Sequence, residues 1–220
     1  MQSLTTLVNL VRYKLSGEKY QHNLFRVGMT LTLEPTPFLL AGDAIKTKSP
    51  MTGGDLVTSV TAVGLLNEGD VTLNRLYFND DSSFLQLWLE ADGTIAECRY
   101  FSRHDQEIPE DQEDWDVWLN DENGLIGWPQ FQSLDGKLYD RRWAPGSARI
   151  EPRMLQETIT STAGTGTRDL RAMLYAAPTG LAAPAPQTEY ILLSAVEQGE
   201  RAWVDIHAGI DINPAGLSIA

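Results

Sequence analysis

The clearest pattern along the chain is the alternation of apolar and polar positions between residues 71 and 101. Alternation with a period of two is typical of half-buried β-strands. Asp92-Gly93 lies in this segment and is the pair that a two-residue type I′ turn favours. A hairpin closed by this turn places Leu87 opposite Cys98 and makes one face apolar along its whole length. The segment therefore predicts three consecutive antiparallel strands, of which the last two form the hairpin.

The same kind of pattern predicts two further hairpins in the middle of the chain. Residues 56–66 are rich in β-formers, and the polar run 67–70 turns the chain back into the strand that starts at residue 71. Residues 124–143 are rich in aromatic side chains and contain Asp135-Gly136, which predicts another turn between two strands.

A last hairpin is predicted near the C-terminal end. With a two-residue turn at 198–199, Ala195 faces Ala202 and one face of the hairpin is apolar. The opposite face then carries Trp203, Asp205 and His207.

Helices are predicted in three places, from apolar residues at helical spacing. They cover residues 3–15, 111–120 and 152–159, and the second turns Trp115 and Trp118 inward with its acidic side chains outward. Residues 23–34 predict a strand that ends at Pro35. Loops are predicted at 45–55, 161–167 and 177–187 from their serine, threonine, glycine and proline content.

These elements predict a mainly β, α+β fold of twisted antiparallel sheets, built from hairpins and a meander, with two or three short helices. We expect residues 1–220 to form a single compact unit. The alternative is a division into two β subdomains, an N-terminal meander half at 1–104 and a C-terminal half at 105–220.

Composition adds information on the cellular compartment. Hydrophobic residues make up 42% and charged residues 21% of the chain, as in soluble globular proteins. Cys98 is the single cysteine, which excludes an intrachain disulfide, and its place on the apolar face predicts a buried thiol. No basic segment followed by an apolar run begins the chain, and no stretch approaches the roughly 18 apolar residues of a membrane span. We therefore expect a cytoplasmic protein without a transmembrane segment.

Charge is the feature that bears most on function. The formal net charge is −13, and nine acidic residues lie between Asp105 and Glu122 without a lysine or arginine. This balance argues against nucleic acid as a partner, because phosphate binding needs a basic surface. The segment lacks the residue order of a calcium-binding loop. It predicts either a solvated acidic face or a docking surface for a basic protein partner.

The docking hypothesis assigns binding roles to the acidic segment and to the aromatic and arginine-rich stretch that follows it. Arg141, Arg142 and Arg149 are expected to pair with the acids. The candidate binding residues are Asp105, Glu107, Glu110, Asp111, Glu113, Asp114, Asp116, Trp128, Tyr139, Arg141, Arg142 and Trp143.

No catalytic or metal-binding motif with a known mechanism occurs in the sequence, so no catalytic residue, cofactor or metal is predicted. A competing hypothesis is a small-ligand-binding protein or enzyme with a pocket between sheets around Tyr139, Asp140, Arg141 and Arg142. The glycine-rich run 164–168 is a minor candidate for an anion-binding loop. A third hypothesis is an oligomeric scaffold that pairs through exposed strand edges.

Several short segments resemble, in the same order, the YjfK-like family of uncharacterised bacterial proteins, which share domain of unknown function 2491. The segments are FRVG at 25–28, LNRLYF at 73–78, IGWP at 126–129, YDRRW at 139–143, MLY at 173–175 and the stretch 206–212. The family has no established activity, so the resemblance implies no catalytic residues. It implies an association with phage-shock-type membrane-stress proteins and with ATP-grasp amide ligases. The absence of catalytic motifs together with the concentration of charge makes a non-enzymatic, cytoplasmic adaptor the leading hypothesis, and the resemblance links it to the envelope stress response.

Overall fold

Antiparallel pairing between neighbouring strands organises the protein. The computed structural model describes residues 25–50, 56–68, 71–78, 82–90 and 94–220. The predicted helix at 3–15 and the turn at Asp92-Gly93 lie outside these residues. Within them the protein is mainly β, which confirms the predicted fold class, and its two α-helices are α2 (Thr36–Ala41) and α3 (Gln112–Leu119).

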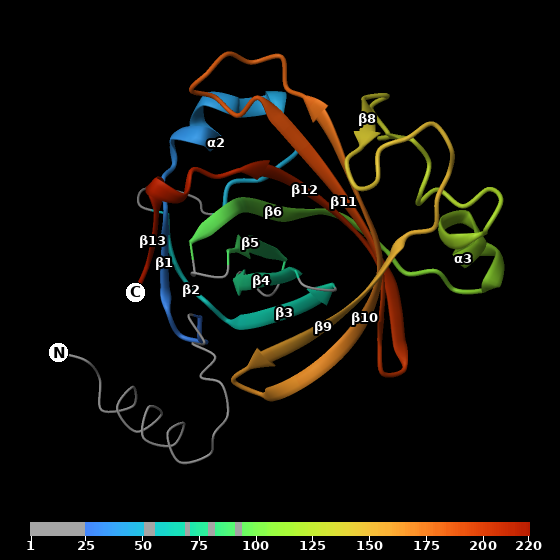
Figure 1. Cartoon of the computed structure of the whole chain (residues 1–220), viewed down its shortest axis with the longest axis horizontal. Coiled ribbons are helices and arrows are strands. Elements are labelled where there is room, and N and C mark those ends of the chain that lie inside the picture. Colours follow the sequence, from blue (N-terminus) through green and yellow to red (C-terminus); the bar gives the residue numbers. More distant parts are fainter. Residues whose placement is uncertain (1–24, 51–55, 69–70, 79–81, 91–93) are drawn as a thin grey trace.

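Eight strands pair in the order β11-β12-β6-β5-β4-β3-β9-β10. The first and last strands of this order, β11 and β10, also pair with each other and close the sheet into a barrel (Figure 1). This closure was not predicted, but it follows the expected antiparallel pairing. The strands are β3 (Ala62–Glu68), β4 (Val71–Phe78), β5 (Ser83–Leu89), β6 (Ile95–Glu107), β9 (Arg153–Ser161), β10 (Gly164–Pro178), β11 (Thr188–Gln198) and β12 (Arg201–Asp211).

Smaller elements flank the barrel. A three-stranded sheet, β13-β1-β2, is formed by β1 (Thr30–Leu33), β2 (Leu56–Ser59) and β13 (Leu217–Ile219). The hairpin of β7 (Gln130–Gln132) and β8 (Leu138–Arg141) pairs with β10. Short 3₁₀ turns lie at η1 (Gly42–Ala44) and η2 (Pro214–Gly216). In Figure 1 the small sheet and α3 lie on opposite sides of the barrel.

Three clusters of buried apolar side chains hold these layers together. The inner core draws on seven of the barrel strands, with Trp203 of β12 packed against it, and therefore fills the barrel interior. The first outer core joins the small sheet and α2 to the outside of β4, β5 and β6. The second outer core joins the segment around α3 and β8 to the outside of β10, β11 and β12. Burial of this apolar area is the main favourable contribution to folding.

The hairpin of β5 and β6 follows the predicted register from Leu85 to Trp88, with Leu87 opposite Cys98. The register then shifts, and Leu89 pairs with Ile95 instead of Ala96, as at a β-bulge. Cys98 is 4% exposed, and burial raises the pKa of its thiol to about 12, so the predicted buried thiol is confirmed. The β3–β4 hairpin is confirmed as well.

The C-terminal hairpin forms as predicted, but its turn lies one residue further along the chain. Gln198 pairs with Arg201, and Ala195 faces Val204 instead of Ala202. Moving a turn by one residue moves each partner by two, which preserves the faces of the strands. Gly199 has a φ of +61°, which this turn requires.

The predictions for residues 152–167 were wrong. The expected helix at 152–159 is strand β9, and the expected loop at 161–167 is mostly the start of β10, paired with β9 from Gly164 onward. Residues 164–168 therefore belong to strand β10 and pair with β9, and they do not form an anion-binding loop. The strand expected at 23–34 is only β1, and Pro37 lies in the first turn of a helix that was not expected, where its fixed φ is tolerated.

Replacement of Gly209 by alanine tests how tightly the barrel interior is packed. A Cβ atom at this position would lie 2.6 Å from Cε1 of Phe101. We expect Gly209→Ala to lower the free energy of unfolding by about 1–3 kcal/mol, measured by urea denaturation. Gly166→Ala is the control, because its Cβ atom would meet nothing within 4 Å. Equal effects of the two changes would contradict this packing.

Candidate functional site

Charged side chains lie inside the barrel together with the inner core. Side chains two residues apart on a strand share a face. The charged and polar side chains of this group lie two positions from members of the inner core, or opposite them in a ladder, and therefore face the barrel interior. We call this group the interior polar cluster. Its members are Arg75, Tyr77, Gln86, Arg103, Glu157, Arg168, Asp205 and His207.

Glu157 is the centre of one half of the cluster and is fully buried. Its carboxylate accepts hydrogen bonds from Tyr77 Oη at 2.6 Å, Arg75 Nη1 at 3.2 Å and Arg168 Nε at 2.9 Å. Arg75 Nε also donates to Gln86 Oε1 at 3.1 Å. Burial alone would favour the neutral acid, but the two guanidinium groups and the tyrosine hydroxyl outweigh it and lower the pKa of Glu157. Glu157 is therefore an anion at neutral pH.

Gly64 of β3 makes room for this carboxylate. A Cβ atom at Gly64 would lie 2.9 Å from Cδ of Glu157 and 3.0 Å from a ring carbon of Tyr77. Only glycine leaves space for the acid to approach the backbone of β3.

Asp205 is the centre of the other half. Its oxygens accept hydrogen bonds from Gln106 Nε2 at 2.8 Å and Trp203 Nε1 at 2.7 Å. Arg103 Nε lies 3.4 Å from Asp205 Oδ1. His207 is opposite Arg103 in the β6–β12 ladder and is 6% exposed.

Burial lowers the pKa of His207 to about 4. Asp205 opposes this shift, whereas Arg75, Arg103 and Arg168 lower the pKa further because each carries a positive charge. The imidazole is therefore neutral at physiological pH, and the positive charge inside the barrel resides on the arginines.

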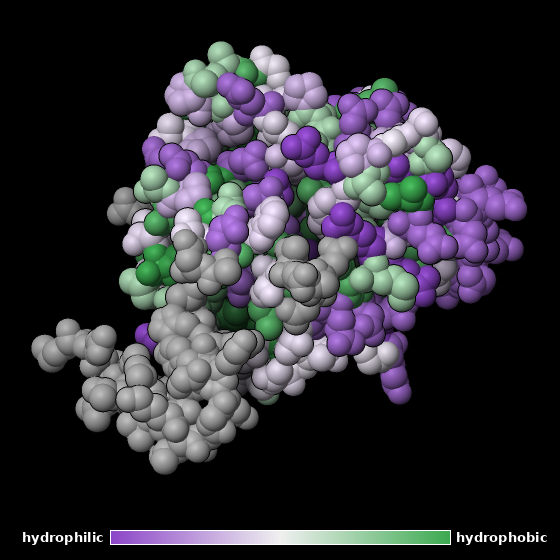
Figure 2. Space-filling model, in the orientation of Figure 1, coloured by the Kyte–Doolittle hydropathy of each residue, from purple (hydrophilic) through white to green (hydrophobic). Residues whose placement is uncertain are grey.

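The candidate acids of the 105–122 segment lie on the surface, at the end of β6 and around α3. Asp105 and Glu107 end β6, and all seven candidate carboxylates are exposed. Asp111 caps α3 by accepting hydrogen bonds from the N–H groups of Glu113 and Asp114, at 2.9 and 3.1 Å. The predicted helix at 111–120 is confirmed as α3. Figure 2 shows hydrophilic residues gathered over this region.

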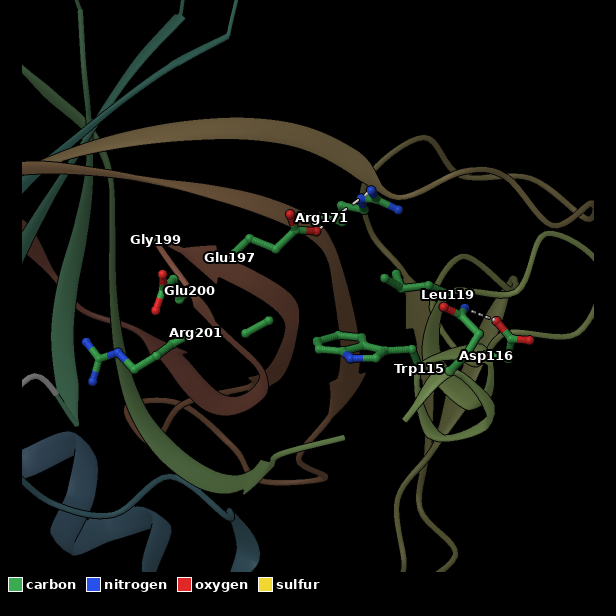
Figure 3. A pocket seen from close by; sticks show the side chains of 10 residues that line it. Trp115, Asp116, Leu119, Arg171, Glu197, Gly199, Glu200 and Arg201 are labelled. Atoms are coloured by element: carbon green, nitrogen blue, oxygen red, sulfur yellow. Dashed lines mark hydrogen bonds and ion pairs between the residues drawn. The ribbon is translucent and has the colours of Figure 1, made fainter. Parts of the chain in front are cut away.

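The indoles of α3 face inward, as predicted. Trp115 and Trp118 are half-buried and pack against the second outer core. Between α3 and the tip of the β11–β12 hairpin lies an open groove of about 430 Å³, lined by Trp115, Asp116 and Arg201 among others (Figure 3). Trp115 points from α3 toward the hairpin, and Arg171 pairs with Glu197 at 3.8 Å along the groove.

The aromatic and arginine-rich candidates do not line one pocket. Tyr139 is buried, and its hydroxyl donates to Glu189 at 2.7 Å. Asp140 and Arg141 line an open groove of about 600 Å³ together with Trp128, which is 41% exposed. The side chain of Arg142 is exposed.

Two of the three arginines expected to pair with the acidic segment bind main-chain oxygens and not carboxylates. Arg141 is buried and donates to the carbonyl groups of Gly127, Ala144, Gly146 and Ala148. Arg149 donates to the carbonyl groups of Asn120, Asp121, Gly124 and Ile126. These two side chains fix the loops around β7 and β8. Trp143 is half-buried, with the guanidinium of Arg153 at 4.9 Å from its ring.

The interior polar cluster was not predicted from the sequence. The available signal was the placement of Asp205 and His207 on one face of the last hairpin, together with Arg75 in the middle of a predicted strand. An alternating strand gives no indication that its polar face lies inside a barrel.

The described residues offer neither a metal-binding group nor a membrane-spanning helix. They contain no group of three or more His, Cys, Asp or Glu side chains placed to hold a metal ion. None of their helices has the length and apolar character needed to cross a bilayer.

Replacement of Glu157 by glutamine tests the charge balance of the cluster. Glu157→Gln leaves the guanidinium groups of Arg75 and Arg168 buried without their counter-charge. We expect a loss of about 3–5 kcal/mol in the free energy of unfolding, measured by urea denaturation at neutral pH. Glu197→Gln, which changes an exposed acid, is the control and should cost less than about 0.5 kcal/mol. A loss of similar size in both variants would contradict the central role of Glu157.

The lowered pKa of His207 predicts a pH dependence of stability. Between about pH 6.5 and pH 4 the unfolded chain protonates this imidazole and the folded protein does not, so stability falls as the pH falls. The loss is on the order of 3 kcal/mol. We expect His207→Asn to remove this part of the pH profile and His104→Asn, at an exposed position, to retain it. Unfolding curves at several pH values measure the difference, and identical profiles would contradict it.

Comparison with known proteins supports the resemblance noted from the sequence. No curated protein and no solved structure matches the chain. A family profile described as "Protein of unknown function (DUF2491)" matches residues 22–218. The match covers all eight strands of the barrel, which lie between residues 62 and 211. The chain therefore belongs to the DUF2491 family of proteins of unknown function.

Proposed function

We propose that this protein is a non-enzymatic, cytoplasmic adaptor whose acidic face binds a basic segment of a partner protein. The acidic face consists of Asp105, Glu107, Glu110, Asp111, Glu113, Asp114 and Asp116. The observation that carries the proposal is that all seven carboxylates are exposed and that no described lysine or arginine lies within ion-pair distance of them. Their charge is thus available to a partner.

The acidic face has a fixed shape. Asp111 caps α3, and Trp115, Trp118 and Leu119 anchor the helix on the second outer core. A surface that is ordered before binding loses less conformational entropy when a partner docks.

Exposed apolar side chains adjoin the carboxylates. Ile108 is 69% exposed, Val117 51% and Leu125 42%, and the N–H of Leu125 donates to the carbonyl of Val117 at 2.9 Å. Apolar side chains on an exposed surface often mark a protein-interaction site. The partner segment that fits this face therefore combines lysine or arginine with apolar residues, and one of its side chains can enter the groove beside Trp115.

The resemblance described above suggests which partners to test first. These are phage-shock-type membrane-stress proteins and ATP-grasp amide ligases, which would link the adaptor to the envelope stress response. The small-ligand alternative around Tyr139, Asp140, Arg141 and Arg142 receives less support, because Tyr139 is bonded to Glu189 and Arg141 to carbonyl groups.

Removal of four charges from the acidic face tests the proposal. The variant carries Glu107→Gln, Glu110→Gln, Glu113→Gln and Asp116→Asn. It keeps Asp111, which caps α3, and Asp114, which accepts a hydrogen bond from the N–H of Glu110 just before the helix. We expect a partner captured from lysate at low salt to bind this variant about tenfold or more weakly, because each exposed ion pair contributes about 0.2–1 kcal/mol. High salt should weaken binding to the wild type in the same way.

A control variant carries the same change in net charge elsewhere. It replaces exposed acids away from α3, with Asp43→Asn, Glu90→Gln, Glu151→Gln and Asp169→Asn. Binding of the partner to this control should equal that of the wild type. If both variants lose the partner equally, net charge alone is responsible, and if neither loses it, the acidic face is not the docking site.

A further inference from the structure

Three nitrogen atoms of the interior polar cluster have no hydrogen-bond partner among the described residues. They are Arg75 Nη2, His207 Nδ1 and Arg103 Nε, the last of which has only the 3.4 Å ion pair with Asp205. Arg75 is 2% exposed and His207 6% exposed, so bulk solvent does not satisfy these atoms. Buried polar groups in native proteins are almost always paired, and such an exception points to a bound ion or ligand.

The three nitrogen atoms belong to one region of the barrel. The guanidinium carbon of Arg75 lies 4.8 Å from the centroid of the Phe84 ring, and the ring of His207 lies 5.0 Å from the same centroid. Arg103 is the direct ladder neighbour of His207. His207 thus links the three groups, because it shares the Phe84 ring with Arg75 and the β6–β12 ladder with Arg103.

The charges in this region do not balance. Three guanidinium groups, those of Arg75, Arg103 and Arg168, face two carboxylates, those of Glu157 and Asp205. Glu157 is already held by two arginines and Tyr77, and Asp205 by Gln106 and Trp203. Arg103 is 32% exposed and pairs with Asp205, so with a neutral imidazole the excess positive charge belongs to Arg75 and Arg168, which share the single carboxylate of Glu157. A buried charge of this kind is stable when it is paired with a counter-ion.

We propose that the barrel interior binds a compact oxyanion, a carboxylate or a phosphate, between the side chains of Arg75, Arg103 and His207. Guanidinium nitrogens and an imidazole N–H suit the acceptor oxygens of such an anion. The ligand is compact because the aromatic rings of Tyr77, Phe84 and Phe101 fill the surrounding interior. The side chain of Arg103 is 32% exposed and marks the end of the barrel from which the anion enters. The acidic face begins two residues further along β6, at Asp105, and its carboxylates are exposed on the surface.

Thermal unfolding of the full chain tests the proposal. Sodium acetate and sodium phosphate are titrated at constant ionic strength, with sodium chloride as the reference salt. We expect a saturable rise in Tm with at least one oxyanion, because a ligand that binds the folded state stabilises it. A rise in Tm with acetate indicates a carboxylate site, and a rise with phosphate indicates a phosphate site. In the same titration, NMR of the His207 side chain should show a rise in its pKa, because a neighbouring anion favours the imidazolium.

Two variants assign the effect to the site. Arg75→Lys keeps the charge and removes the second guanidinium nitrogen, and we expect about tenfold weaker binding. Arg103→Lys, at the more exposed end, should weaken binding as well and serves if Arg75→Lys does not fold. Arg171→Lys, on the exposed outside of β10, is the control and should bind as the wild type does. The proposal is overturned if Tm follows ionic strength alone while the pKa of His207 stays constant, or if the site variants bind as tightly as the wild type.

Discussion

The backbone ladder between β10 and β11 is the constraint on which the rest of the structure depends. Its ten residue pairs, from Asp169 opposite Glu197 to Pro178 opposite Thr188, close the eight strands into a ring. Without this ladder the strands would form an open sheet with two free edges. Closure directs one face of every strand toward a shared interior and leaves the other face for the outer layers. The two outer cores could not form on the opposite sides of the molecule without this frame.

A closed barrel also limits what its interior can hold. Charged side chains that point inward lose most of their contact with bulk water, so they need partners from the facing strands. Glu157 of β9 finds them on β4 and β10, and Asp205 of β12 finds them on β6 and within its own strand. Gly64 of β3 leaves space for the carboxylate of Glu157, and Gly209 of β12 leaves space for the ring of Phe101. The polar contacts and the apolar packing inside the barrel therefore depend on each other.

Local pairing could be read from the sequence, whereas long-range closure could not. Alternation and turn residues predicted the β3–β4, β5–β6 and β11–β12 hairpins and the faces of their strands. The β9–β10 hairpin was missed because the Ser, Thr and Gly residues at 161–167 have the composition of a loop, and Leu155 and Ile159 have helical spacing. The pairing of β3 with β9, which joins Ala62 to Ser161, leaves no local signal. The acidic residues of α3 were predicted because exposed charge is visible in composition. The interior polar cluster requires the closed topology, which only the structure provides.

Strand β5 contributes side chains to the first outer core on one face and to the inner core on the other. Leu85 and Leu87 point into the first outer core, while Phe84 and Gln86 point into the barrel, and all four are buried. Because protein interiors are densely packed, this strand cannot move toward one side without disturbing the other. The small sheet and the arginines around Phe84 are thus mechanically linked through a single layer of backbone. The amides of this layer should be among the slowest in the protein to exchange with solvent, because their release requires both cores to open together.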